Sequence, residues 1–421
     1  MKNSKDKIYI PRILEGKILR LLDAPEIIAV FGARQVGKTT LMRHVYDGLP
    51  EPKIFLDFED PELVGLFDED AKAFAQLYVE GKRYVFIDEF QHSRVGGRHL
   101  KFLYDSYPVK FFVSGSSSLD LAIEAASALV GRVFILELYP LSLGEFLSYR
   151  APDLFQVAQQ RIVDNAPLPQ ALHTKLMDLV EEFCTWGGYP RVVTSKNSEE
   201  KEEVLKGIFT TYLLKDIKGF FRLSTESNLQ KLLRALALQV GELIRYEELS
   251  KVSGLSYSSL KEHLSILEET YVISISRPFF TNKRLEIVKN PKVYFQDVGM
   301  RNYVCKDFRD WELRADKGHL LENLVAGEIL KEGEELHFWR TKSGAEVDFV
   351  IQGRGGVVPV EVKSGVASNP GRSLVSFIKK YRPSKAYVIH SGEVFSREVE
   401  GTVVSLLPFY ALPFWKARDD A

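Results

Sequence analysis

The sequence has few cysteines and no excess of either charge. Only Cys184 and Cys305 occur among 421 residues, far apart and without a paired C-x-x-C. This excludes a disulfide framework and a zinc ribbon, and it indicates a reducing compartment. The formal net charge is −1, so no overall basic field attracts nucleic acid, and any such binding has to come from a local patch.

The sequence also lacks long apolar runs. None approaches the roughly 18 residues that are needed to span a bilayer. The first residues, MKNSKDKIYIPR, carry charge but no apolar core of a secretory signal. We therefore expect a cytoplasmic protein without a membrane partner. No internal repeat is present, which sets solenoid architectures aside.

The length and the apolar content indicate several globular domains. A chain of 421 residues exceeds the roughly 250 to 300 at which single cores stop growing. Residues 26 to 31 (EIIAVF) form an apolar run that leads into a glycine-rich loop and then a helical segment. Further β-like runs follow at 53 to 58, 83 to 87, 110 to 113 and 133 to 138. Their continuous hydrophobicity predicts a buried parallel sheet, hence an α/β fold.

The segment GARQVGKT fits the pattern G-x-x-x-x-G-K-[ST]. Glycines in such a loop let backbone N–H groups surround phosphates, and the start of the following helix adds a positive dipole. Lys38 would reach the β and γ phosphates of ATP. The residues expected to bind the nucleotide are Gly32, Ala33, Arg34, Gln35, Val36, Gly37, Lys38, Thr39 and Thr40.

An acidic pair ends the apolar run YVFIDE. We expect Thr39 and Asp88 to hold Mg²⁺, and Glu89 to orient and activate the attacking water. A nucleotide-binding switch without hydrolysis does not require that second carboxylate. The alternative is a chance coincidence of a glycine turn and an acidic strand end.

Two further residues are candidates for catalysis. Ser116 lies in SGSSS, after a third apolar strand, where a polar group can sense the γ-phosphate; the alternative is an ordinary turn. Arg132 precedes the next strand and could act in trans as an arginine finger, which implies a homo-oligomer. The alternative for Arg132 is a plain surface arginine.

Six segments together are similar to one known family: GARQVGKTT, FIDEFQ, VSGSSS, GRVFILELYPLSLGEF, WGGYP and TYLLKDI. They resemble the AAA-type ATPases whose carboxy-terminal half is the DUF4143 region, over nearly the whole chain. This resemblance implies an AAA-type core, a helical lid, a winged helix and a nuclease-like end. We assign these parts to residues 1–150, 151–235, 236–305 and 306–421, with 152–170 read as a loop.

Residues 246 to 271 have the spacing of a helix-turn-helix. The second helix would present Ser256, Ser258, Ser259 and Lys261 to a major groove. Residues 272 to 301 hold six basic residues against two acidic ones, as expected of a wing that binds DNA phosphates. These eight are Arg277, Lys283, Arg284, Lys289, Lys292 and Arg301, with Glu286 and Asp297. The alternative is a protein-packing module.

The last hundred residues contain a second group of carboxylates. Asp348 and Glu361 lie on successive strands whose hairpin would bring them together, and Lys363 follows on the same side as Glu361. With Glu322 from the preceding helix, they resemble the PD-(D/E)XK nuclease constellation, which holds Mg²⁺ and activates a water. The alternative is a degenerate, structural version.

These observations predict an Mg²⁺-dependent ATPase that couples nucleotide state to a DNA-directed module with a nuclease-like end. The rival hypothesis is a nucleotide-dependent switch or scaffold that binds protein partners. A chaperone-like remodelling ATPase is a third alternative, but the sequence has no recognisable pore-loop signature.

Overall fold

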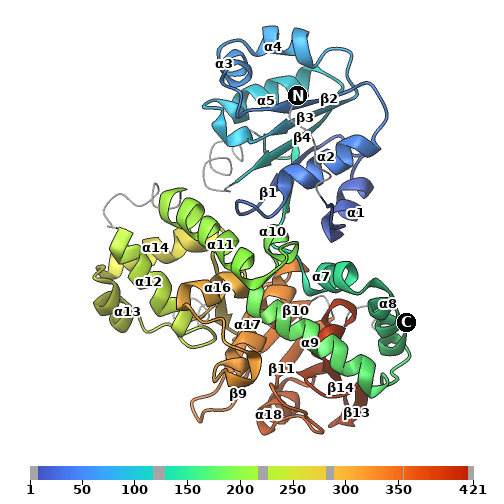
Figure 1. Cartoon of the computed structure of the whole chain (residues 1–421), viewed down its shortest axis with the longest axis vertical. Coiled ribbons are helices and arrows are strands. Elements are labelled where there is room, and N and C mark those ends of the chain that lie inside the picture. The colour runs from blue at the N-terminus through green and yellow to red at the C-terminus, as the bar shows by residue number, and fades with distance from the viewer. Residues whose placement is uncertain (1–7, 117–128, 217–225, 281–288, 354, 416–421) are drawn as a thin grey trace. The chain divides into compact units, whose positions relative to one another are not determined.

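The computed structural model describes residues 8–116, 129–216, 226–280, 289–353 and 355–415 (Figure 1). The chain divides into two compact units. The first unit is Met1–Pro140 with Glu269–Tyr271, and the second is Leu141–Glu268 with Val272–Ala421. The four domain bounds expected from the sequence remain predictions.

A five-stranded parallel sheet forms the centre of the first unit. Its order is β2-β3-β4-β1-β5. The strands are β1 (Ile27–Phe31), β2 (Lys53–Asp57), β3 (Tyr84–Asp88), β4 (Lys110–Gly115) and β5 (Val133–Glu137). Every residue of the three central strands is buried, which explains their continuous apolar sequence. The predicted α/β fold with a buried parallel sheet is confirmed.

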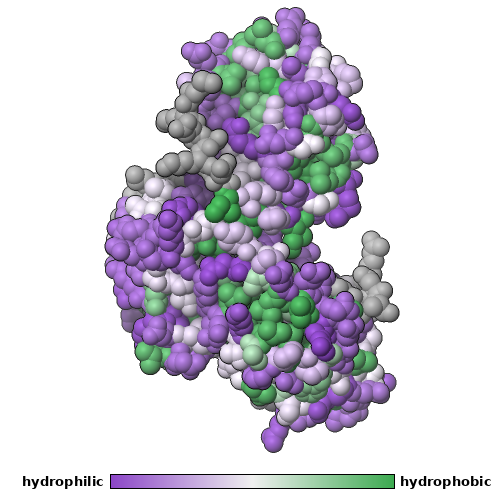
Figure 2. Space-filling view, turned by 45° about the vertical axis from the view of Figure 1, so that its right-hand side comes forward, coloured by the Kyte–Doolittle hydropathy of each residue, from purple (hydrophilic) through white to green (hydrophobic). Residues whose placement is uncertain are grey.

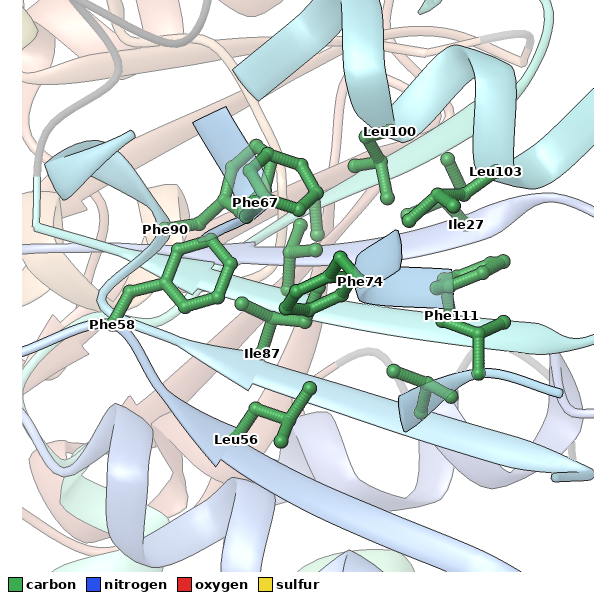
Figure 3. Packing of buried hydrophobic residues seen from close by; sticks show 14 of the residues in the cluster. Ile27, Leu56, Phe58, Phe67, Phe74, Ile87, Phe90, Leu100, Leu103 and Phe111 are labelled. Carbon is green, nitrogen blue, oxygen red and sulfur yellow. The ribbon is translucent and has the colours of Figure 1, made fainter. Parts of the chain in front are cut away.

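Helices and a layer of aromatic rings accompany this sheet. The helices of the first unit are α1 (Ile13–Arg20), α2 (Lys38–Gly48), α3 (Pro61–Glu69), α4 (Ala71–Tyr78), α5 (Gly96–Ser106) and the short η1 (Phe90–His92). Four phenylalanines meet in the core, at residues 58, 67, 74 and 90 (Figure 3). Their ring centroids lie 5.1 to 6.1 Å apart, in the range of favourable aromatic pairs. This packing fixes η1, which directly follows the acidic pair.

The second unit begins with helices. They are α7 (Leu143–Arg150), α8 (Pro152–Val163), α9 (Gln170–Trp186), α10 (Pro190–Val193), α11 (Ser198–Ile208), the π-helix η2 (Phe209–Asp216) and α12 (Glu226–Leu238). The expectation of a loop over 152–170 was wrong. Pro152 occupies the first turn of α8, where its missing N–H costs no intrahelical bond. Pro167 and Pro169 lie between α8 and α9.

The expected helix-turn-helix elements are present. Helices α13 (Tyr246–Ser253) and α14 (Tyr257–Glu269) are separated by Gly254, whose φ of 73° is left-handed. Strands β6 (Ile273–Pro278) and β7 (Lys292–Phe295) follow as an antiparallel pair. The assignment of a DNA-binding winged helix to this region remains a prediction.

The carboxy-terminal part is a second α/β arrangement. It contains α17 (Lys317–Lys331), β8 (His337–Arg340), β9 (Glu346–Val347), β10 (Phe349–Gly353), β11 (Gly356–Val362), α18 (Arg372–Tyr381), β12 (Lys385–His390), β13 (Phe395–Val399), β14 (Thr402–Pro408) and η5 (Phe409–Phe414). One sheet has the order β10-β11-β12-β14-β13, and another has the order β7-β6-β8-β9. Because β6 pairs with β8, the region after α14 and the carboxy-terminal region share a sheet.

Close backbone approaches explain the glycines of WGGYP. A Cβ on Gly187 would lie 2.3 Å from the Asp297 carboxylate, and one on Gly188 would lie 2.3 Å from the carbonyl oxygen of Leu141. Asp297 accepts hydrogen bonds from the N–H groups of Gly188 (2.7 Å) and Met300 (2.8 Å). It thereby caps helix α16 (Val298–Cys305) and holds the end of α9 against it.

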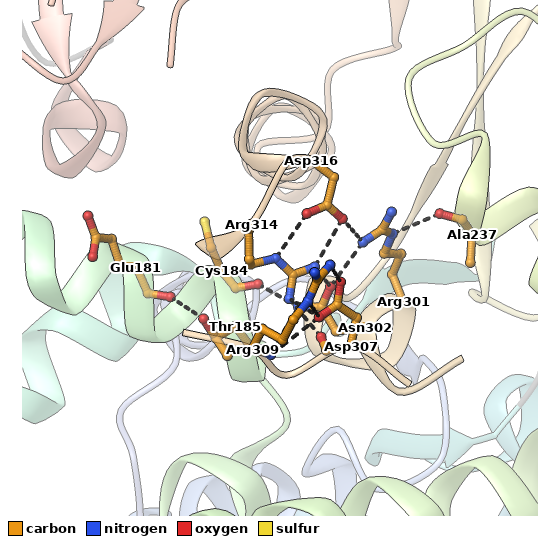
Figure 4. Close-up of polar contacts among 10 residues, drawn as sticks. All are labelled: Glu181, Cys184, Thr185, Ala237, Arg301, Asn302, Asp307, Arg309, Arg314 and Asp316. Atoms are coloured by element: carbon orange, nitrogen blue, oxygen red, sulfur yellow. Dashed lines mark hydrogen bonds and ion pairs between the residues drawn. The ribbon is translucent and has the colours of Figure 1, made fainter. Parts of the chain in front are cut away.

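A buried polar network joins the same helices to the start of α17 (Figure 4). The guanidinium groups of Arg301 and Arg314 both contact Asp316. Asn302 donates hydrogen bonds of 2.9 Å to the carbonyl oxygens of Cys184 and Thr185, at the end of α9. Carbonyl groups that the helix leaves unsatisfied thus find donors inside the unit.

Both units have exposed apolar side chains among the described residues. On the face shown in Figure 2, hydrophilic residues predominate and apolar patches are interspersed. Exposed large apolar side chains include Ile13, Leu77 and Ile135 in the first unit, and Leu238 and Val366 in the second. Such scattered residues are normal. Among the helices in the described ranges, none has the length and apolar character to cross a bilayer.

Candidate nucleotide-binding site

The predicted phosphate loop connects β1 to α2. Gly37 is the N-cap of α2 and has a left-handed φ of 100°, a conformation that favours glycine. Gly32 lies so close to the chain after β5 that a Cβ there would be 2.1 Å from the carbonyl oxygen of Leu138. Steric constraints therefore explain why both positions are glycine. The N–H groups at the start of α2 are the donors that an anion site uses.

Lys38 lies inside the curve of this loop. Its side chain is only 5% exposed, and its ammonium donates to the carbonyl oxygens of Gly32 and Ala33, each at 2.9 Å. Burial lowers its pKa to about 8, although the carboxylates of Glu89 and Asp88 oppose this shift. A phosphate would offer this ammonium a stronger, charged acceptor than the two carbonyl groups do.

The acidic pair lies at the end of β3, where the sequence predicts it. Asp88 is 1% exposed and accepts a hydrogen bond from the hydroxyl of Ser114 on β4. Glu89 has a left-handed backbone, with φ 52° and ψ 41°. Non-glycine residues adopt this conformation at a cost, and it is often found where a side chain has a functional orientation. The two carboxylates therefore have different surroundings, one buried and one half-exposed.

Gln91 has a contact that the sequence did not predict, although it was part of the family resemblance. Its side-chain amide donates to the Glu89 carboxylate, and its carbonyl oxygen accepts a hydrogen bond of 3.2 Å from the N–H of Ser116. Ser116 is buried at the end of β4, and residues 117–128 lie outside the described ranges. The described part of the SGSSS segment thus contacts the acidic pair through Gln91.

Arg12 also supports the loop, and the sequence analysis missed it. Its guanidinium donates to the carbonyl oxygens of Val36 (2.8 Å) and Tyr139 (2.6 Å). It is a buried arginine just after the apolar residues of IYIP. A single charged residue after an apolar segment only weakly indicates a role at the phosphate loop, because both of its partners are backbone groups far away in the sequence.

Arg132 lies on the turn before β5 and is bound within its own chain. It makes a bidentate ion pair with Asp105 on α5, at 2.8 and 3.3 Å. The hydrogen bond that Arg132 donates to the Asp105 carboxylate raises the pKa of the guanidinium. The described side-chain hydrogen bonds of Arg132 go to Asp105 and to the carbonyl oxygen of Val130, so its role in trans remains a prediction.

The residues of the loop fit Mg²⁺ by their chemistry. Thr39 supplies a hydroxyl and Asp88 a buried carboxylate, and Mg²⁺ prefers such oxygen ligands. Bound there, Mg²⁺ would neutralise charge on the phosphates.

A parallel sheet in this order, a phosphate loop between β1 and α2, and an acidic pair after β3 define a P-loop ATPase. Comparison with family models agrees. Residues 24–147 match the model of an AAA domain, residues 177–310 a domain of unknown function (DUF8612), and residues 317–411 a domain of unknown function (DUF4143). The chain therefore contains an ATPase domain of the AAA type and a DUF4143 domain, as the resemblance implied.

Similar whole chains come from bacteria and archaea. An uncharacterized protein of Haemophilus influenzae is 26% identical over 84% of this chain and 86% of its own. One of Mycobacterium tuberculosis is 25% identical over 90% of this chain and 79% of its own. Among solved structures, a Walker-type ATPase of Pyrococcus abyssi has a TM-score of 0.45 at 17% identity, covering 70% of this chain and 96% of that one.

The predicted nuclease residues lie near one another, since the charges of Glu322 and Glu361 both act on Asp348. Strands β10 and β11 pair as the expected hairpin, and Asp348 accepts a hydrogen bond of 2.7 Å from the N–H of Val362. Glu361 contacts Lys363 at 2.9 Å, and Glu322 contacts Lys292 at 3.0 Å. No three histidine, cysteine or carboxylate side chains in the described residues form a group that could hold a metal ion.

The expected basic wing differs from the structure in its surface charge. Lys292 and Arg301 are buried and contact carboxylates of the second unit, so they cannot meet a phosphate backbone. Arg277 and Lys289 are exposed. Lys283, Arg284 and Glu286 lie outside the described residues. The net charge over 272–301 therefore overstated the basic surface, because sequence does not distinguish an internal lysine from an external one.

Proposed function

We propose that this chain hydrolyses ATP with Mg²⁺ at the phosphate loop, and that the nucleotide cycle controls DNA binding by the second unit. The position of Glu89 carries the hydrolytic part. It directly follows the buried Asp88 and is held by Gln91, so a second carboxylate is available to orient water.

The roles follow from the chemistry of each group. Lys38 binds the β and γ phosphates, Thr39 and Asp88 hold the metal ion, and Glu89 takes a proton from the attacking water. Ser116 senses the γ-phosphate, and Arg132 of a second copy neutralises charge that develops on the transferred group. The proposed active species is thus a homo-oligomer.

The start of α14 supports contact with DNA. Tyr257, Ser258 and Lys261 are exposed there, at the end of a recognition helix that enters a major groove. The ammonium of Lys261 lies 4.6 Å from the centroid of the Tyr257 ring. A lysine held over an exposed aromatic ring can meet a phosphate while the ring contacts a sugar or base.

A second candidate is a nucleotide-dependent switch or scaffold that binds protein partners. The burial of Lys292 and Arg301 favours it, because it leaves the region after α14 with fewer exposed cations. Glu262 and Glu269 are exposed on α14 and repel phosphate.

The experiment is steady-state ATP hydrolysis with Mg²⁺, titrated with single-stranded and double-stranded DNA. Lys38→Ala and Glu89→Gln control for contaminating activity. We expect DNA to stimulate hydrolysis, and Lys261→Ala to weaken that stimulation while it leaves the rate without DNA unchanged. Hydrolysis that does not respond to DNA would favour the protein-binding switch. Equal hydrolysis by Glu89→Gln and wild type would contradict the proposed catalytic role.

A further inference from the structure

One group of carboxylates in the second unit surrounds a buried lysine. We call Glu322, Glu346 and Asp348, together with Lys292, the acidic centre. We infer that the ammonium of Lys292 is the resident cation of this centre, so that the centre holds no divalent metal and breaks no phosphodiester bond. The inference concerns the second unit alone and does not depend on the proposed ATP hydrolysis.

The distances place the ammonium between carboxylates from two different elements. Lys292, on β7, is only 3% exposed. Its Nζ atom lies 3.0 Å from Glu322 Oε1 on α17 and 2.6 Å from Glu346 Oε1 on β9. The hydroxyl of Tyr294, two residues further along β7, also donates to Glu322. Two donors and two acceptors are thus joined by three contacts inside the protein.

The electrostatics keep this lysine charged. Two carboxylates lie within hydrogen-bond distance of its ammonium and favour the charged form. A divalent cation entering the centre would meet a fixed positive charge and would have to displace it from both partners. One positive charge therefore already offsets part of the carboxylate charge without a metal.

The other predicted nuclease residues are also engaged. Asp348 accepts from the N–H of Val362 at 2.7 Å, and Glu361 accepts from the N–H of Gly371 at 2.8 Å. The ammonium of Lys363 lies 2.9 Å from Glu361 and forms an ion pair with it. Its charge is therefore compensated by a carboxylate and is not available to a substrate phosphate. The residue types of the PD-(D/E)XK pattern are present, but their arrangement does not fit Mg²⁺.

The centre instead joins two matched regions of the chain. Lys292 lies in the DUF8612 match, whereas Glu322 and Glu346 lie in the DUF4143 match. Strand β7 and strand β9 are the two edges of one four-stranded sheet, and α17 also contacts β7. A buried charge with partners on α17 and β9 fixes the register of these elements, because any slip would leave it unpaired.

The test measures Mn²⁺ binding by electron paramagnetic resonance in the nucleotide-free full-length chain. All variants carry Thr39→Ala, which removes the hydroxyl ligand at the phosphate loop. The matched pair is Lys292→Met and Lys289→Met, since Lys289 is exposed and only three residues away. We expect the parent and Lys289→Met to bind no Mn²⁺ in the second unit. We expect Lys292→Met to gain one site, which a further Glu322→Gln change removes.

Two results would overturn the inference. One is a stoichiometric Mn²⁺ site in the parent that Asp348→Asn abolishes, together with DNA cleavage that the same change abolishes. The other is a folded Lys292→Met variant, with the circular dichroism of the parent, that gains no site. If Lys292→Met fails to fold while Lys292→Met with Glu322→Gln folds, the ion pair itself is supported, because removing both charges restores the balance. Asp348→Asn in the parent still tests the metal.

Discussion

The side-chain amide of Gln91 connects the Glu89 carboxylate to the end of β4. Its amino group donates to Glu89, and its carbonyl oxygen accepts the N–H of Ser116 at 3.2 Å. One residue thus holds the proposed base and also contacts the segment that follows β4, where a γ-phosphate sensor is expected. A change in that segment can reach the carboxylate through this amide.

We therefore predict that Gln91→Ala lowers the turnover number for ATP by about tenfold, because a base that loses its orientation is less effective. Nucleotide affinity should change little, since no described contact joins Gln91 to the phosphate loop. Steady-state kinetics with a separate binding titration would distinguish the two effects. His92→Ala is the matched control, because His92 is exposed on the same short helix η1. Equal turnover in the two variants would contradict a positioning role.

Because the pKa of Lys38 is lowered, we predict that the affinity for ATP depends on pH. Its pKa is lowered to about 8 in the structure, and phosphates would favour its charged form. Above pH 8 the free protein has a neutral lysine that must take up a proton when ATP binds, so affinity falls as the pH rises. From about pH 7.5 to about pH 9.5 we expect roughly 20-fold weaker binding.

Titration calorimetry at several pH values would measure this loss, with buffers of different ionisation heat to count the proton taken up. Lys38→Arg is the matched variant, since a guanidinium stays charged over the whole range. It should bind ATP with little pH dependence. A wild-type affinity that is constant up to about pH 9.5 would show that Lys38 keeps its charge in the free protein.

From the polar network at the start of α17, we predict that two arginines differ in how much they stabilise the fold. Arg301 is buried and donates to Asp316 and, at 2.8 Å, to the carbonyl oxygen of Ala237. Arg301→Met should lower the free energy of unfolding by about 2–4 kcal/mol, because buried acceptors lose their donor. Arg309→Met should have little effect, since its side chain is 60% exposed where it pairs with Asp307. Urea unfolding followed by circular dichroism would compare them, and similar midpoints would contradict a stabilising network.

The loop and the strand end that carry the proposed nucleotide site could be predicted from the sequence because they are local. Lys38, Thr39 and the two glycines lie in one continuous strand, loop and helix. Asp88 is the last residue of β3, whose apolar run is plain in the sequence. The hairpin that carries Asp348 and Glu361 was also predicted, since its turn lies between them in the sequence. Each of these inferences needed only neighbouring residues and the period of a strand or helix.

The buried cations could not be predicted in the same way. Lys292 looked like part of a basic wing, and only the fold brings Glu322 and Glu346 to it from α17 and β9. Similarly, Arg12 is a single arginine in the sequence, and its two carbonyl partners come from the phosphate loop and the segment after β5. Long-range pairing determines whether a charge is internal, and composition carries no information about it.

The arginine finger is the part of the proposal that needs a second copy of the chain. Arg132 is tied to Asp105 in its own chain, so in this proposal it has to leave that carboxylate to reach a neighbour's phosphate. We predict that Arg132→Ala lowers turnover at least tenfold, since such arginines stabilise the charge of the transition state. Asp105→Ala is the matched variant. It removes the competing carboxylate, so turnover should stay the same or rise.

Rates measured over a wide range of protein concentrations should show a rise in specific activity for wild type and a flat, low value for Arg132→Ala. If Arg132→Ala hydrolyses ATP as fast as wild type at every concentration, the pair with Asp105 is only a surface ion pair and the active species needs no arginine from a neighbour.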